Sequence, residues 1–165
     1  MASVEYAARA PEGLVSELKL SVGKAVEIRD TVLAFSAGLK GVVAIADRTG
    51  MPLCLQVTDG DGLIGATVPS VLGKLKKVVD AHKSNRVQRE TMAARGIRPL
   101  SSTGELLTDL DDGVAVFADK ERQEFVGAVA YSGGLDDQGE RMCIDAIEMA
   151  GLFTDIPPKV EEASS

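Results

Sequence analysis

The stretch GVVAIADRTGMPLCLQVT, residues 41–58, consists of two short apolar runs separated by a polar turn. Residues 41–47 are almost entirely apolar, as expected of a strand that is covered on both faces, and residues 52–58 form the second run. The tripeptide RTG between them is a turn signal, so the two runs predict a β-hairpin. Strands joined by a hairpin are antiparallel, which decides the fold class.

The residues on either side of this hairpin predict helices and a second hairpin. Apolar residues recur at three- and four-residue spacings over residues 14–39 and 68–82, which predicts two long helices. The remaining elements are a helical piece at 84–95, loop over 96–112 with a short strand near Leu106, strands at 113–118 and 124–132 around a turn, and a helix at 134–151. This order predicts an α+β fold, with helices flanking an antiparallel sheet of about five strands.

The length and composition indicate one soluble domain. A chain of 165 residues suits a single domain over residues 13–155, and the polar or proline-containing ends at 1–12 and 156–165 predict flexible tails. A net charge of −7 and an aromatic content of 4% argue against nucleic-acid binding. We expect no membrane span, because no run of about 18 apolar residues occurs. Without a visible secretory signal or paired cysteines, we expect a cytoplasmic location.

Residues 59–67, DGDGLIGAT, contain the spacing G-x-G-x-x-G, which is found where strand-to-helix turns bind dinucleotides. The preceding strand belongs to a hairpin rather than to a parallel crossover, and no strand carrying an acidic residue follows at the required distance. Asp59 and Asp61 would also repel a pyrophosphate. We therefore expect neither NAD nor FAD, and interpret these glycines as turn residues.

Four segments together resemble the GlcG/HbpS-like family, which comprises haem-binding proteins and PduO C-terminal-like domains. They span about residues 18–152: the first helix, then VVAIADRTGMPLCLQVTDG, the helix containing KLKKV, and VGAVAYSGGLDDQGERMCIDAIEMAGL. The resemblance implies a profilin-like antiparallel sheet flanked by helices, a homo-oligomer of two or more copies, and a small-molecule ligand such as haem. The chain departs from the family pattern at residues 111–117, where the usual glycine-rich strand is missing, and at Glu140, next to the position of the usual aspartate.

Two groups of residues are candidates for binding an anionic ligand. Ser132, Gly133 and Gly134 precede the last helix, where backbone N–H groups can bind a carboxylate or phosphate; an ordinary capped helix start is the alternative. Lys74 and Lys77 belong to the one basic concentration of the chain, together with Lys76, Arg86 and Arg89. They could pair with ligand carboxylates, or could simply lie on a solvated helix face.

Tyr131 and His82 are the remaining candidates. Tyr131 lies at the end of the last strand, where its ring could face a pocket, although packing is the simpler interpretation. His82 is the single histidine and could be an axial ligand of haem iron. Its position on an apolar stripe near a helix C-terminus favours packing instead. Because His and Cys residues do not cluster, we predict no metal site of several protein ligands.

These observations lead to three functional hypotheses. The first is a soluble, oligomeric protein that binds haem or another anionic small organic ligand in a cleft near the Ser-Gly-Gly turn. The second is a small-molecule enzyme of lyase, isomerase or hydrolase type in a catabolic or biosynthetic pathway. It would use the same cleft, with Lys74, Tyr131 or an acidic residue as proton donor. The third is an assembly partner without a ligand.

Overall fold

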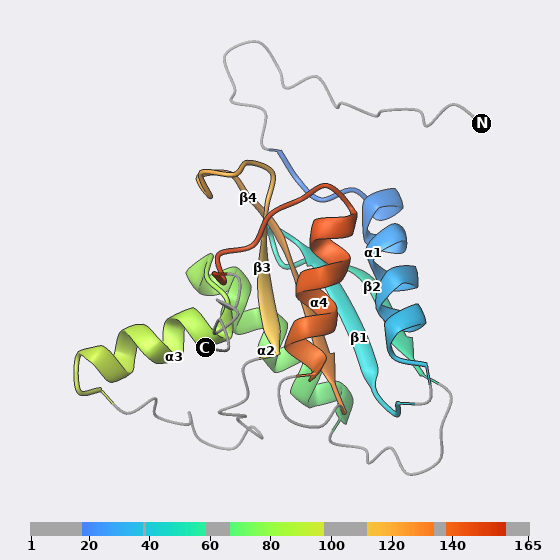
Figure 1. The fold of residues 1–165 in the computed structure, drawn as a ribbon, viewed down its shortest axis with the longest axis horizontal. Coiled ribbons are helices and arrows are strands. Elements are labelled where there is room, and N and C mark those ends of the chain that lie inside the picture. Colours follow the sequence, from blue (N-terminus) through green and yellow to red (C-terminus); the bar gives the residue numbers. More distant parts are fainter. Residues whose placement is uncertain (1–17, 38, 59–66, 98–111, 134–137, 158–165) are drawn as a thin grey trace, which may run out of the picture.

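The computed structural model describes residues 18–37, 39–58, 67–97, 112–133 and 138–157. Within these ranges the chain forms one four-stranded antiparallel sheet with helices on both faces (Figure 1). Its elements are α1 (Val22–Phe35), β1 (Val42–Asp47), β2 (Pro52–Val57), α2 (Thr67–Ala81), α3 (Asn85–Ala94), β3 (Gly113–Phe117), β4 (Phe125–Ser132) and α4 (Gln138–Met149). The predicted α+β class is confirmed, as are both hairpins.

Several sequence predictions lie outside the described residues. They concern the N-terminal tail at residues 1–12, the glycine-containing loop at 59–66, the short strand near Leu106 and Gly134. The sheet therefore has four strands in the part of the chain that the structure describes, where we predicted about five.

The sheet joins the two hairpins edge to edge in the order β2-β1-β4-β3. The central strands β1 and β4 pair in register, with Val43 opposite Tyr131 and Ile45 opposite Val129. Every residue of β1 and β4 is buried, whereas β2 at one edge is largely exposed. The apolar run of β1 before Asp47 is thus explained by helices that cover both faces of the strand.

Side chains along the central strands alternate between two different helix layers. Val43, Ile45 and Val129 belong to the core under α1 and α4, which lie in front of the sheet in Figure 1. Ala44 and Ala130 belong to the core under α2, which lies behind it. Small side chains on this second face allow α2 to lie close to β1, β3 and β4.

Helix α1 begins at Val22, not near residue 14 as the apolar spacing predicted. Ser21 caps the helix, since its hydroxyl accepts a hydrogen bond from the Lys24 N–H at 3.1 Å. The preceding Leu20 is buried, and its N–H donates to the Val126 carbonyl at 3.0 Å. This tertiary hydrogen bond and the serine cap hold the backbone before Ser21 out of the helix.

Past α4, the described chain stays packed on the domain through residue 156, which is the first residue of the predicted tail. Phe153 bridges to Phe117 of β3, and the Asp155 carboxylate accepts hydrogen bonds from the N–H and hydroxyl of Ser84. Ile156 is buried in the core under α1 and α4. Residues 153–156 are therefore held against the β3 edge and the core of the domain. None of the described helices has the length and hydropathy needed to cross a bilayer.

Candidate functional site

A group of buried charged side chains lies at the end of the sheet where β4 finishes. The Lys74 ammonium, on the sheet side of α2, donates to Asp112 Oδ2 at 2.9 Å and to the Tyr131 carbonyl at 3.0 Å. Only 1% of Lys74 is exposed. Glu140 of α4 is also buried and forms an ion pair with Arg86 of α3. We call Lys74, Asp112, Arg86 and Glu140 the sheet-end cluster.

The free cysteine of α4 lies next to this cluster. Burial raises the pKa of the Cys143 thiol far above its ordinary value, and the neighbouring charge of Asp112 raises it further. Cys143 is therefore a neutral thiol near neutral pH, unsuited to act as a nucleophile or a thiolate ligand. Among the described residues, no group of three or more His, Cys, Asp or Glu side chains could hold a metal ion.

Two glycines let the backbone pack closely around the cluster. A Cβ on Gly139 would lie 3.1 Å from the Asp112 carboxyl carbon and equally close to the ring of Tyr131, and one on Gly113 would lie 2.4 Å from the Asn85 amide. The charged groups are thus enclosed by backbone and side chains of five elements, α2, α3, β3, β4 and α4. A buried ion pair contributes little net stability, because desolvation offsets the attraction of its charges, so such clusters often serve function.

The start of the Ser-Gly-Gly turn lies at the same end of the sheet. The Ser132 hydroxyl is 3.3 Å from the hydroxyl of Ser70, one helical turn before Lys74. Gly133 has φ of +117°, and a Cβ there would lie 2.3 Å from the Lys40 carbonyl oxygen, so only glycine fits. The structure thereby brings Ser132 and Gly133 near Lys74, as the predicted site requires.

The remaining candidates have different surroundings. Tyr131 lies at the cluster through its carbonyl and ring, but its buried hydroxyl is close to Gly41, and burial raises the pKa of the phenol. Lys77 is half-buried on α2. His82 follows α2 with φ of +51° and stacks on Phe125, with ring centroids 4.2 Å apart. Because Phe125 begins β4 and Ser132 ends it, His82 lies at the opposite end of the sheet from the cluster.

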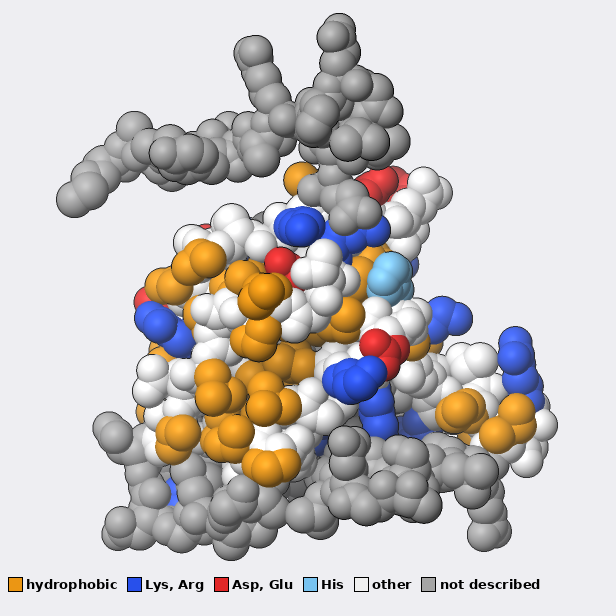
Figure 2. Space-filling model, turned by 180° about the vertical axis from the view of Figure 1, so that it is seen from behind, with side chains coloured by type: hydrophobic (Ala, Val, Ile, Leu, Met, Phe, Trp, Pro, Cys, Tyr) orange, Lys and Arg blue, Asp and Glu red, His pale blue; other side chains and the backbone are white. Residues whose placement is uncertain are grey.

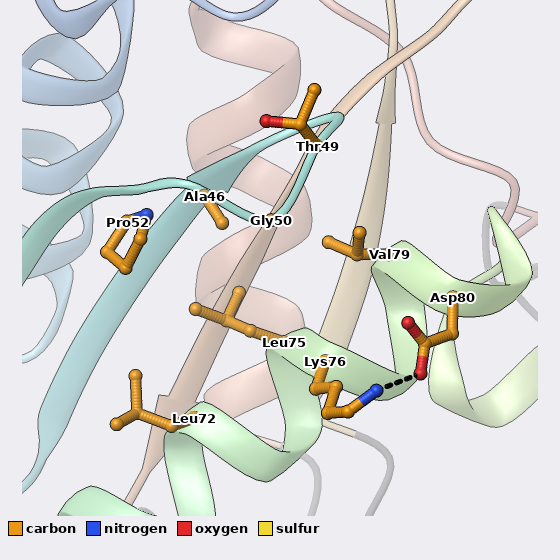
Figure 3. A pocket seen from close by; sticks show the side chains of 9 residues that line it. All are labelled: Ala46, Thr49, Gly50, Pro52, Leu72, Leu75, Lys76, Val79 and Asp80. Carbon is orange, nitrogen blue, oxygen red and sulfur yellow. Dashed lines mark hydrogen bonds and ion pairs between the residues drawn. The ribbon is translucent and has the colours of Figure 1, made fainter.

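A groove opens at the His82 end of the sheet, between α2 and the turn joining β1 to β2. Helix α2 packs on β1, β3 and β4 but, among the described residues, not on the edge strand β2, which leaves this space uncovered. The groove has a volume of about 350 Å³. Its lining is mostly apolar, with a Lys–Asp ion pair on the α2 side (Figure 3); we call it the hairpin groove, and its residues are Ala46, Thr49, Gly50, Pro52, Leu72, Leu75, Lys76, Val79 and Asp80.

A broad hydrophobic surface adjoins the hairpin groove. Leu55 and Val57 of β2 lie opposite Ala44 and Val42, so they are on the α2 side of the sheet, and they are 48% and 46% exposed. Leu72 on α2 is 40% exposed. Figure 2 shows hydrophobic side chains gathered on this side of the molecule. An exposed apolar surface of this kind is typical of binding sites.

A second pocket, of about 310 Å³, lies at the other end of β2, against the end of α1. Polar and apolar groups line it in similar measure. Its residues are Leu33, Ser36, Ala37, Leu39, Gln56, Val57 and Thr58, and none of the predicted site residues is among them.

Haem requires an apolar slot, a cation for its propionates and a ligand for its iron. The hairpin groove offers apolar walls and Lys76, but its nine lining residues include no histidine, cysteine, methionine or tyrosine. Met51, 61% exposed between two lining residues of the turn, carries a thioether that can ligate iron. In the sheet-end cluster, Lys74 is both paired with Asp112 and buried, whereas the paired Lys76 of the groove is 72% exposed and can be reached by a ligand carboxylate. The groove therefore fits the porphyrin ring and its carboxylates better than the cluster does.

No sequence pattern indicated that Asp112 pairs with Lys74, that Glu140 pairs with Arg86, or that the hairpin groove exists. One signal for a buried lysine was present, because Lys74 falls between Val71 and Val78 at the three- and four-residue spacing of the apolar stripe. Asp112 is 38 residues away along the chain, so no local pattern connects the two.

No family model matches the chain, and no curated protein matches it by sequence. Solved structures share its fold. A PduOC–haem complex has a TM-score of 0.69 at 17% identity, covering 83% of this chain and 99% of that one. Klebsiella pneumoniae protein ORFY has a TM-score of 0.68 at 15% identity, covering 86% of this chain and 97% of that one. A double mutant of Streptomyces reticuli HbpS has a TM-score of 0.67 at 21% identity, covering 90% of this chain and 98% of that one. At these identities the likeness establishes the fold, which is the one that the sequence resemblance implied.

Proposed function

We propose that the protein is a ligand-binding protein of GlcG/HbpS-like type that binds a planar, mainly apolar molecule carrying carboxylates, with haem as the example. We assign the ligand to the hairpin groove. The observation that carries this proposal is an apolar groove with the ammonium of Lys76 on its α2 side. A structure of similar fold was solved as a complex with haem, which supports this class of ligand.

The residues of the groove have distinct parts in this proposal. Leu72, Leu75 and Val79 pack against one face of the ring, and each square ångström of apolar surface withdrawn from water contributes about 25 cal/mol. Lys76 pairs with a ligand carboxylate at the solvent side. Haem would supply iron-centred redox and ligand-binding chemistry when bound. The protein's part is to bind the ring, orient its carboxylates outward and exclude water from one face.

Titration with hemin tests the proposal. We expect a saturable shift of the Soret band at one haem per chain, and a weaker affinity for Leu72→Glu, which places a charge against the ring. Met149→Glu is the control, because Met149 is an exposed apolar residue on α4, on the other side of the sheet. A flat titration of the unaltered protein, or an equal loss in both variants, would contradict binding in the groove.

The sheet-end cluster supports a second candidate, an enzyme that acts on a small organic acid. The specific observation is the buried Lys74–Asp112 pair beside Ser132 and Gly133, which could bind a substrate carboxylate and move a proton. Small carboxylates such as pyruvate, malate and oxalate can be screened for a rise in melting temperature. A rise that is lost in Ser132→Val but kept in Leu72→Glu would support this site; no rise with any acid would count against it.

We further propose that the protein forms a homo-oligomer in the cytoplasm. Among the described residues, no strand pairs with the outer edge of β2, and its exposed Leu55 and Val57 would be covered by a second copy.

A further inference from the structure

The cation of the hairpin groove is already paired with a carboxylate of the protein itself. The Lys76 ammonium lies 2.5 Å from Asp80 Oδ2, and both side chains line the groove, as the dashed line in Figure 3 marks. They are one helical turn apart on α2. A ligand carboxylate that approaches Lys76 from the groove would therefore meet Asp80 at the same ammonium.

The Lys76–Asp80 pair costs little to open. Both side chains are well exposed, at 72% and 60%, and exposed ion pairs of this spacing contribute only a fraction of a kcal/mol, about 0.3–0.5. Burying the ring against Leu72, Leu75 and Val79 would contribute more free energy than opening this ion pair costs. An anionic ligand can thus displace Asp80 from Lys76. An uncharged ligand has no carboxylate to offer the ammonium, so the Lys76–Asp80 pair would stay closed.

Resting on the proposed binding of a carboxylate-bearing ring in this groove, we propose that Asp80 is a built-in competitor for the ligand carboxylate. In the free protein the Asp80 carboxylate pairs with Lys76. When a charged ligand binds, the ligand carboxylate replaces Asp80 at the ammonium, and the displaced Asp80 then repels the ligand. Asp80 thereby determines specificity: it lowers the affinity for anionic rings and leaves the affinity for uncharged rings of the same shape unchanged.

Two probes with the same ring test this: hemin, which has two propionates, and its dimethyl ester, which has none. Dissociation constants are measured for the unaltered protein and for Asp80→Asn, Lys76→Met and Asp145→Asn. Asp145 is the matched control, because it forms an exposed ion pair of the same spacing with Arg141 on α4, on the opposite side of the sheet. Asp145→Asn changes the net charge by the same amount as Asp80→Asn, at a position outside the groove.

We expect Asp80→Asn to tighten hemin binding by about two- to fivefold and Lys76→Met to weaken it by a similar factor, with the ester unaffected by either. Asp145→Asn should change neither. An unchanged hemin affinity in Asp80→Asn, or equal changes for hemin and ester, overturns the competitor role while leaving the binding site intact. If neither probe binds saturably to the unaltered protein, the proposed function itself fails, and the competitor role with it.

Discussion

At the scale of single residues, Lys74 carries a buried charge that joins α2 to two distant parts of the chain. Its ammonium is buried with Asp112 and bonds the backbone at Tyr131. We predict that Lys74→Met lowers the free energy of unfolding by about 3–5 kcal/mol, because it leaves the Asp112 carboxylate buried without its cation. Lys74→Met combined with Asp112→Leu should recover most of this loss. Urea unfolding of the three proteins measures it, and a stable single variant would show that Asp112 finds another partner or water.

His82 allows a second test at this scale. Its imidazole stacks on Phe125, and its φ of +51° is a conformation that glycine adopts more easily. We predict that His82→Ala lowers stability by about 0.5–1.5 kcal/mol through the lost ring contact. It should leave the hemin-induced Soret shift in place, because His82 is not among the groove-lining residues. Loss of the shift in a folded His82→Ala protein would instead identify the imidazole as the iron ligand.

At the scale of elements, aspartates organise the turns of both hairpins. Asp47 Oδ1 accepts hydrogen bonds from the N–H and hydroxyl of Thr49 and from the N–H of Met51. Asp119 likewise accepts from the N–H groups of Gln123 and Glu124. Burial opposes ionisation of Asp47, but these hydrogen bonds outweigh it and hold its pKa below the ordinary value. Hydrogen bonds from the N–H groups of Glu124 and Gln123 likewise hold the pKa of Asp119 below its ordinary value.

The lowered pKa of Asp47 predicts the sign of a pH dependence. A carboxyl with a lower pKa in the folded state stabilises the protein above its unfolded pKa, near 3.8, and this stability is lost as pH falls through the folded value. Asp47→Asn should therefore be less stable than the unaltered protein by about 1 kcal/mol at neutral pH, and the difference should shrink in acid. Urea unfolding at several pH values measures this, with Asp145→Asn as a control. A difference that is constant with pH would exclude the charge of Asp47 as its cause.

Elements that depend on local pattern could be predicted, and those that depend on distant contacts could not. Residues 41–58 predicted a hairpin because strand periodicity and turn residues are adjacent in the chain. The start of α1 was misplaced because Leu20 bonds to Val126, far along the sequence. The burial of Lys74 depends on Asp112, and the hairpin groove lies where α2, in the part of the chain that the structure describes, does not pack on β2. The predicted Ser132, Gly133 and Lys74 do lie close together, because α2 packs on β4 and brings Lys74 to the end of that strand.

At the scale of the whole molecule, the two faces of the sheet differ in coverage. Helices α1 and α4 cover one face, and α1 extends over β2. On the other face α2 covers the strands β1, β4 and β3, so that, within the described ranges, the outer strand β2 has one edge without a neighbouring strand and exposed apolar side chains. The groove and the hydrophobic surface are two consequences of this one asymmetry. A ligand and a second copy of the chain would therefore meet on neighbouring surfaces.

The asymmetry leads to a prediction about assembly. We expect the purified protein to be a dimer or a larger symmetric oligomer by light scattering coupled to size-exclusion chromatography. Leu55→Lys combined with Val57→Lys should shift it to the monomer, because charges on an edge strand oppose pairing with another edge. Met149→Lys, at an even more exposed apolar position on α4, should not. If the double variant keeps its mass while Met149→Lys dissociates, the copies meet through the α1 and α4 layer, and the open face of β2 is left to the ligand alone.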